Sequence, residues 1–303
     1  MATSVANPTW GGGNRPMKAE YGKMMMWYFL LSDALTFSGF LTAYGFMRFK
    51  YESIWPVAED VFTHFPGISG EQPLLYVALM TFILIMSSVT MVLAVNAGHE
   101  LKQSKVAWWM LWTIVGGLVF VGSQAWEWFH FIVGDKGAVE VVDGSIYKVA
   151  QADSEELISL SQLVHGMEHG HAANHFETFT MEEVDAAVRH NDNIVFQSPG
   201  KHHESLSREA TLASLDGARV VQGANMHRNE YGVKQFGNFF FFITGFHGFH
   251  VFSGVIINII IFYNVLLGTY QRRKSYLMVE KVGLYWHFVD LVWVFVFTFF
   301  YLV

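Results

Sequence analysis

The chain has 303 residues, of which 52% are hydrophobic and 17% aromatic, and its formal net charge is −7. Soluble domains rarely carry this aromatic load, so the composition indicates a membrane protein and we expect no nucleic-acid partner. The chain has no cysteine. This excludes disulfides, thiolate metal sites, covalent c-type haem and any copper or iron–sulfur centre that needs a thiolate.

Five apolar windows follow a polar N-terminal tail. The tail, residues 1–23, lacks the apolar core and small-residue cleavage site of a signal peptide and is expected to be cytoplasmic. Each window has about 20 residues or more, enough to cross a hydrocarbon core of roughly 30 Å. They are 24–47, 74–97, 106–133, 236–267 and 282–303. We therefore expect transmembrane helices 1–3 within 24–133 and helices 4–5 within 236–303.

The placement of Lys and Arg predicts the orientation, because cytoplasmic loops carry an excess of these residues. With a cytoplasmic N-terminus, the outer loop between the first two spans holds only Arg48 and Lys50. The cytoplasmic side then holds Arg15, Lys18, Lys23, Lys102, Lys105, Arg272, Arg273, Lys274 and Lys281. We expect a multi-pass protein of the bacterial inner membrane, with its N-terminus inside and its C-terminus outside.

A polar segment, residues 134–235, separates the third and fourth spans and should lie on the periplasmic side. It holds 16 Asp or Glu against 8 Lys or Arg, a net charge of −8. VEVVDGSIYKV (139–149) alternates around Asp-Gly and predicts a hairpin. Asp153 with Glu156, and Thr180 with Glu183, fit capping boxes that open helices. The predicted fold is an all-α bundle of five transmembrane helices with a small α+β extramembrane insertion.

The insertion also contains a histidine-rich stretch, HGMEHGHAANH. Four histidines lie close together there: His165, His169, His171 and His175. The first two are four residues apart, which suits metal ligation on a helix. Solvated histidine-rich loops are commoner, so a metal site here is the weaker of the two interpretations.

Five acidic or histidine side chains lie well inside the first, fourth and fifth apolar windows, where a charged group costs roughly 2.5–3.5 kcal/mol on insertion scales. They are Asp33, His247, His250, His287 and Asp290. At 1.5 Å per residue four of the five could occupy one layer at compatible depths, and the group predicts a polar network between helices. Such a network either holds helices together or handles protons. Asp33 is the member for which we weigh proton handling most seriously.

Three further features flank these spans. Glu127, in QAWEWF (124–129), is expected to snorkel to the membrane interface. Gly245, Gly248 and Gly254 permit close helix approach. Arg272, Arg273 and Lys274 directly follow the fourth span and are candidate contacts for lipid phosphate. The alternative interpretation is that they only set the topology.

At these motifs the chain resembles subunit III of haem–copper terminal oxidases, particularly cytochrome c oxidase. The matching pieces are QAWEWF, TGFHGFHVFSG (244–254) and EKVGLYWHFVDLVWVF (280–295), in the family's order. WYFLLSDALTFSGFLTAYG (27–45) resembles the span with the family's buried carboxylate, with Asp33 where the family usually has Glu. Two departures stand out: the first two of seven spans are absent, as in some bacterial members, and 134–235 replaces a brief connection.

The resemblance implies an accessory subunit that binds no cofactor itself, with haem and copper in partner subunits. It would pack on subunit I, beside subunit II, hold structural phospholipid and support proton uptake and catalytic lifetime during O2 reduction. By this resemblance, Asp33 would have the role of the family's buried carboxylate. An additional respiratory complex or electron-donor subunit is a candidate partner for 134–235.

Other functions stay open at this stage. The close alternative is subunit III of a quinol oxidase or of a nitric-oxide-reductase-associated homologue, because the electron donor is bound by other subunits. A different class is a haem-b membrane anchor, with His247 or His250 and His287 as axial ligands. A metal transporter fed by the histidine-rich loop is a third, although transporters usually place several carboxylates at the midplane.

Overall fold

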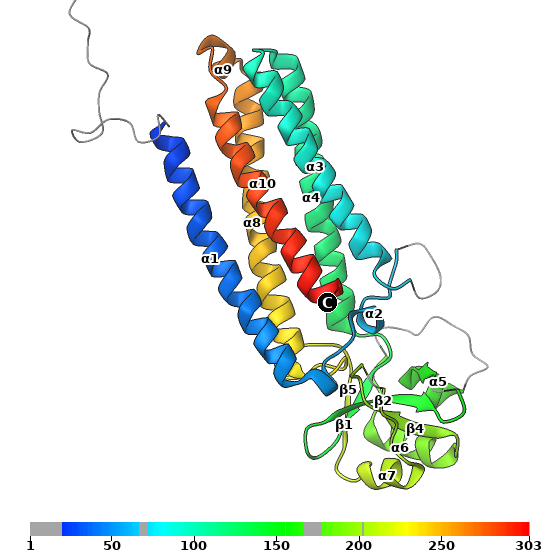
Figure 1. Ribbon diagram of the computed structural model, residues 1–303. Coiled ribbons are helices and arrows are strands. Elements are labelled where there is room, and N and C mark those ends of the chain that lie inside the picture. Colours follow the sequence, from blue (N-terminus) through cyan, green and yellow to red (C-terminus); the bar gives the residue numbers. More distant parts are fainter. Residues whose placement is uncertain (1–19, 67–71, 155, 167–176, 202, 303) are drawn as a thin grey trace, which may run out of the picture.

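A bundle of long helices with a small sheet-containing unit at one end makes up the computed structural model (Figure 1). The structure describes residues 20–66, 72–154, 156–166, 177–201 and 203–302. Within these residues five helices are long and apolar enough to span a membrane, which confirms the predicted fold class. They are α1 (Tyr21–Lys50), α3 (Leu75–His99), α4 (Gln103–Val133), α8 (Lys234–Leu266) and α10 (Leu277–Phe297).

Short elements complete the ends of the bundle. A 3-10 turn (Glu52–Ile54) and α2 (Ala58–Val61) connect α1 to α3, and α9 (Thr269–Arg272) lies between α8 and α10. A π-helical turn, Thr298–Leu302, extends α10. The end of α1, α2 and this turn therefore lie together beside the sheet-containing unit (Figure 1).

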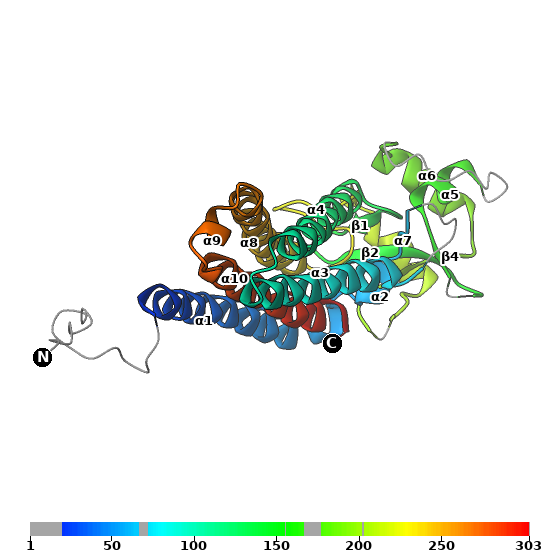
Figure 2. The ribbon, with the colours of Figure 1, turned by 90° about the horizontal axis from the view of Figure 1, so that it is seen from above.

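The helices form a compact group of four with α1 at its margin. α3 packs on α4, α8 packs on α4 and α10, and α10 also packs on α3. α1 packs mainly on α8 and α10 and is the least buried of the five long helices. Figure 2 shows α1 along the outside of α10. Polar side chains on the inner face of α1 therefore meet α8 or α10.

Trp286 of α10 packs where the four inner helices meet. A Cβ at Gly117 of α4 would lie 2.5 Å from the indole ring, and one at Gly254 of α8 would lie 3.0 Å from it. The indole Nε1–H donates to Ser87 Oγ of α3 at 3.1 Å. One buried side chain thus joins α10 to three other helices. Gly254 permits the expected close approach, whereas Gly248 faces open space.

Two more tryptophans repeat this arrangement. Trp293 of α10 donates to Thr81 Oγ1 of α3 at 2.9 Å, and Trp128 of α4 donates to Thr244 Oγ1 of α8 at 3.0 Å. A Cβ at Gly245 would lie 2.9 Å from the Trp128 ring, so this glycine also permits close approach. Because hydrocarbon offers no hydrogen-bond partners, each indole N–H is satisfied on a neighbouring helix.

The insertion folds around its own small core. Its strands are β1 (Ala138–Glu140), β2 (Ile146–Gln151), β3 (Leu157–Ile158), β4 (Ile194–Gln197) and β5 (Arg219–Val221), and its helices are α5 (Leu160–His165), α6 (Met181–His190) and α7 (Arg208–Ser214). The sheet has the order β3-β2-β1-β5, with β4 also paired to β2. β1 and β2 form the predicted hairpin, with Val139 opposite Tyr147. Phe196, Val149 and Val184 lie in the core beneath the helices.

Of the two predicted capping boxes, one forms. Thr180 and Glu183 open α6 with both reciprocal hydrogen bonds. The prediction of a helix start at Asp153 was wrong, because the chain turns back there from β2 to β3. The Gln151 N–H donates to the Glu156 carbonyl at 3.0 Å and closes that turn. The helix begins later, behind a capping box between Ser159 and Gln162.

A buried carboxylate joins the insertion to the bundle. Glu230 is 2% exposed and accepts the Asp135 N–H at 2.8 Å and the Gly223 N–H. Burial raises the pKa of this carboxyl, and the two hydrogen bonds oppose that rise. Ala138 pairs with Val221, so the chain enters and leaves the insertion at neighbouring points. The insertion also contacts the α1–α3 connection, where His203 Nε2 lies 3.8 Å from Asp60 Oδ2.

The Trp286 contact generates the first prediction. Gly117→Ala should destabilise the bundle by about 1–3 kcal/mol, because the added methyl overlaps the indole and Val255. Gly122→Ala on the same helix is the matched control, since a Cβ there meets open space. Thermal unfolding of the chain in its purified complex measures both. Equal melting temperatures for the two variants would contradict the assigned role of Trp286.

Candidate functional site in the bundle

Asp33 of α1 and His250 of α8 form a hydrogen-bonded pair inside the bundle. Asp33 Oδ2 lies 3.1 Å from His250 Nε2, and the side chains are 15% and 10% exposed. Two residues from the expected polar network therefore meet, although 217 positions separate them in the chain. Their contact also joins α1 to the rest of the bundle by a polar interaction.

The hydrogen bonds of His250 define the protonation of the pair. Its Nδ1 lies 2.8 Å from the Phe246 carbonyl, which can only accept, so Nδ1 carries a hydrogen. Nε2 and Asp33 Oδ2 then share one further proton. Either the carboxyl donates to a neutral imidazole, or an imidazolium donates to a carboxylate. Both forms have zero net charge, so the pair holds one exchangeable proton at low electrostatic cost.

Aromatic rings surround this pair. Phe246 and Phe37 lie edge-on to the His250 ring, with centroids 4.7 and 5.6 Å away. The Tyr285 hydroxyl of α10 lies 3.1 Å from the His250 carbonyl and 2.8 Å from Ser253 Oγ. The imidazole is thus held by its hydrogen bond to the Phe246 carbonyl and by aromatic packing. Tyr285 of α10 holds the backbone of His250. The arrangement is suited to holding a proton in a fixed place.

The other intramembrane histidines have different surroundings. His287 Nδ1 of α10 lies 2.6 Å from Ser88 Oγ of α3. Ser88 is also a hydrogen-bonding neighbour of Asp290, and no direct bond joins His287 to Asp290 among the described residues. His247 packs against Trp293, with ring centroids 5.1 Å apart, and neither ring nitrogen has a hydrogen-bond partner in the described part of the chain. The expected layer is divided into separate sites.

These surroundings bear on axial ligation of a haem. Both ring nitrogens of His250 are engaged, one by a carbonyl and one by Asp33. His287 has Nδ1 on Ser88, and His247 lies fully buried between aromatic rings. His250 could therefore ligate an iron only by giving up one of its two hydrogen bonds.

Glu127 differs from the sequence-based expectation. The prediction that it snorkels to the interface is wrong, because its side chain is 5% exposed and points into the bundle. The Tyr301 hydroxyl donates to its two oxygens at 3.0 and 3.1 Å, and Gln124 Nε2 donates at 2.8 Å. These donors compensate the loss of solvent. Sequence reasoning missed Tyr301, which lies 174 positions away and belongs to no motif with Glu127.

The remaining candidates lie at the two ends of the molecule. Arg272 ends α9 and is followed by Arg273 and Lys274, and all three side chains are exposed. At the opposite end, His165 Nε2 lies 3.0 Å from Glu177 Oε1, and His169, His171 and His175 lie outside the described residues. The residues that the structure does describe contain no group of three His, Cys, Asp or Glu side chains placed to hold a metal ion.

Comparison with known proteins matches the segment that carries His250 and His287. The family model for cytochrome c oxidase subunit III matches residues 219–303. Residues 219–303 are therefore similar to the cytochrome c oxidase subunit III family. The matched segment includes α8 and α10 and stops short of α1, so Asp33 lies outside it.

Relatives include cytochrome c oxidase subunit 3 of Synechocystis, 31% identical over 129 residues, which are 41% of this chain and 51% of the relative. The wheat subunit 3 (Triticum aestivum) is 42% identical over 79 residues, which are 25% of this chain and 29% of the relative. That of Thermostichus vulcanus is 34% identical over 74 residues, 24% and 37% of the two chains. The chain thus spans about half the length, or less, of these relatives.

The shared proton predicts an energetic coupling between Asp33 and His250. Asp33→Ala and His250→Ala each leave a buried polar partner unsatisfied, so the double variant should be less unstable than the two effects summed, by about 1 kcal/mol. Unfolding in detergent micelles by a denaturing detergent measures the cycle. Ser38→Ala is the control for α1, because Ser38 bonds only to its own helix. Additivity within about 0.5 kcal/mol would contradict the pairing.

Proposed function

We propose that this chain is an accessory subunit of an aerobic haem–copper oxidase of the cytochrome c oxidase type. In this proposal it packs on subunit I, holds lipid and supports proton uptake and catalytic lifetime during O2 reduction. One observation carries it: the family segment supplies His250, and the carboxyl of α1 bonds directly to that histidine. The residue singled out by resemblance thus lies against the segment that defines the family.

The chemistry of the pair favours a role in proton handling. The pair is neutral while it holds its shared proton, and releasing that proton to a partner subunit leaves one negative charge in hydrocarbon that favours its return. Asp33 lies on the marginal helix α1, nearer to any neighbouring subunit than the buried Glu127. The pair would therefore serve as a local proton store beside the uptake path of the catalytic subunit.

The distribution of charge supports the proposed orientation. Lys23 at the start of α1 forms an ion pair with Glu280 at the start of α10, and Gln103 donates to the Val265 carbonyl at 2.7 Å. The expected cytoplasmic cations that the structure describes lie at one end of the bundle, with the insertion at the other (Figure 1). We place this insertion in the periplasm of a bacterial inner membrane. Arg272, Arg273 and Lys274 would then meet lipid phosphate at the cytoplasmic surface.

Asp33→Ala in the assembled oxidase tests the proton role. Assembly should be preserved, because Asp33 lies on the least buried of the five helices. We expect slower proton uptake and fewer turnovers before inactivation, by roughly 3- to 18-fold, the rate equivalent of the roughly 0.6–1.7 kcal/mol that intramembrane hydrogen bonds contribute. Proton uptake by pH-indicator stopped flow and turnover number by oxygen electrode measure the two effects.

Two variants serve as controls for this measurement. Asp33→Glu keeps a carboxyl and should restore most of the uptake rate, whereas Ser38→Ala on the same helix should leave it unchanged. If Asp33→Ala matches the unmodified oxidase in both uptake and lifetime, the residue is purely structural and the proposed role is lost.

The insertion is proposed to contact an additional respiratory complex or electron-donor subunit. It carries most of the chain's negative charge and folds on its own core, apart from the bundle. Because Ala138 pairs with Val221, residues 138–221 can be replaced by a short glycine linker while Glu230 is retained. The shortened chain should lose an additional subunit from the purified complex and keep O2 reduction in the core. An unaltered subunit composition would refute this docking role.

A further inference from the structure

Glu127 is a second buried carboxyl, separate from the pair of Asp33 and His250. It is 5% exposed and lies near the end of α4 that leads into the insertion. Its hydrogen-bond donors are Tyr301 and Gln124. Both are neutral side chains, so they supply no positive charge to balance a carboxylate. A source of protons close to Glu127 would therefore matter to its state.

The amide of Gln124 fits both protonation states of Glu127. Its Nε2 donates to Glu127 Oε2 at 2.8 Å, as a carboxylate requires. Its Oε1 is buried and has no hydrogen-bond partner among the described residues. A half-turn of the amide exchanges these two atoms, and the oxygen then accepts a hydrogen from the protonated carboxyl. Glu127 can therefore gain or lose a proton while it keeps this partner.

A small cavity beside Glu127 has room for one water molecule. Its volume is about 20 Å³, enough for a single water. The polar side chains in its wall are Glu127, His64, His130, Tyr76 and Tyr231. Because a buried water needs about two to four polar partners, this wall suits one. We call this space the Glu127 cavity.

Two histidines in this wall lead away from the carboxyl. His130 Nδ1 lies 2.9 Å from the Trp126 carbonyl, which only accepts, so Nε2 is the nitrogen that exchanges a proton. The His130 ring lies 5.2 Å from the His64 ring, between centroids. His64 Nε2 lies 3.5 Å from Asp135 Oδ1, and these two side chains are 26% and 22% exposed. The far end of this sequence of groups therefore reaches solvent.

Asp135 lies in the wall of a wider polar space, which we call the Asp135 cavity. It has a volume of about 730 Å³ and lies between the α1–α3 connection and the insertion. A polar space of this size holds many water molecules. Its described wall residues include four carboxyls, Glu59, Asp60, Asp135 and Glu156, and one lysine, Lys136. The excess of acidic groups raises the local concentration of protons there.

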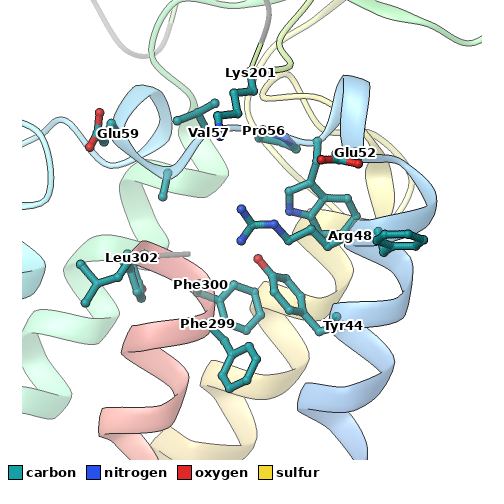
Figure 3. Close-up of a pocket in the computed structure, with 15 residues that line it drawn as sticks. Tyr44, Arg48, Glu52, Pro56, Val57, Glu59, Lys201, Phe299, Phe300 and Leu302 are labelled. Atoms are coloured by element: carbon teal, nitrogen blue, oxygen red, sulfur yellow. The ribbon is translucent and has the colours of Figure 1, made fainter.

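A third cavity lies behind Tyr301 and is separated from Glu127. It has a volume of about 580 Å³ and opens beside the end of α1 (Figure 3). Its lining residues include Tyr301 and not Glu127. Phe300 packs on Tyr44 of α1, with ring centroids 4.1 Å apart, and Figure 3 shows both side chains at this cavity. Tyr301 is 3% exposed and lies between this space and the carboxyl.

We propose that Glu127 exchanges its proton with the aqueous phase on the insertion side, through one water molecule and the pair of His64 and Asp135. The carboxyl gives its proton to the water, the water gives one to an imidazole nitrogen, and a carboxylate or water of the Asp135 cavity takes it up. Each step breaks one O–H or N–H bond and forms another. The exchange needs neither the Asp33–His250 pair nor the proposed function.

Titratable groups face this route from each element around it. Those at the Glu127 end are Tyr76 of α3, His130 of α4, Tyr231 before α8 and Tyr301 of the π-helical turn. Those at the other end surround Lys148 of β2 and are Asp60 of α2, Asp135, Lys136 and Glu230. The fixed charges therefore lie around Asp135, and the groups in the wall beside Glu127 are neutral or histidine.

Infrared difference spectroscopy of the full chain, in its purified complex within sealed vesicles, measures the exchange. The C=O stretch of a protonated carboxyl changes with pH, and Glu127→Gln identifies the band of Glu127. A pH step on the insertion side should change this band, and the same step on the other side alone should not. A band that follows the other side would overturn the proposal. So would the absence of a Glu127 band at every pH at which the complex stays assembled.

The route is tested with His64→Ala. After transfer to D2O, deuterium exchange of the Glu127 carboxyl should be slower by about 100-fold, the lower end of what a positioned proton-transfer group contributes. Free imidazole on the insertion side should restore the rate, which a purely structural role of His64 would not allow. His227→Ala is the matched control, because His227 is exposed and lines neither the Glu127 cavity nor the Asp135 cavity. Equal rates in the two variants would overturn the route.

Tyr301→Phe distinguishes the Glu127 cavity from the cavity at the end of α1. This variant removes the hydroxyl and keeps the ring, so exchange through His64 should continue at close to the unmodified rate. Loss of exchange in Tyr301→Phe together with normal exchange in His64→Ala would assign the proton path to the cavity at the end of α1. That result would overturn the proposal.

Discussion

The hydrocarbon core supplies no hydrogen-bond partners, and the arrangement of the five helices follows from this constraint. Trp286 satisfies its N–H on Ser87 while its ring fills the space left by Gly117 and Gly254. A polar bond and close packing therefore act at the same place and join four helices. Similar bonds from Trp293 and Trp128 fix the neighbouring levels of the bundle. α1 has no such tryptophan bond and is joined to the bundle by the Asp33–His250 hydrogen bond and, at its start, by the Lys23–Glu280 ion pair.

Local patterns in the sequence were enough for much of the fold. Hydropathy located all five long helices, and the Asp-Gly hairpin formed as predicted, because both depend on residues close together in the chain. Asp33 and His250 were recognised as costly intramembrane groups, yet their pairing across 217 positions had no sequence signal. The error at Glu127 has the same cause, since its partner Tyr301 is supplied by a distant turn. The surroundings of Asp33 and Glu127 therefore depend on contacts with residues far away in the chain.

The two ends of the bundle differ in what they can bind. One end gathers the Lys23–Glu280 ion pair and the exposed Arg272–Lys274 cluster. The other carries the insertion, whose entry is bonded to Glu230 and whose Lys201 reaches back to the end of α1. The insertion is thus both a separate folding unit and a contributor to a surface of the bundle.

The pairing of Asp33 with His250 also has a consequence for how the protein is made. α1 leaves the ribosome first, and it has the lowest hydropathy of the five spans. His250 follows 217 residues later, roughly 10 to 40 s at synthesis rates of about 5–20 residues per second. Throughout that interval the carboxyl of Asp33 has no histidine. The first helix must therefore enter the bilayer with the Asp33 carboxyl protonated or beside another protein. It must then stay there until the fourth span is inserted.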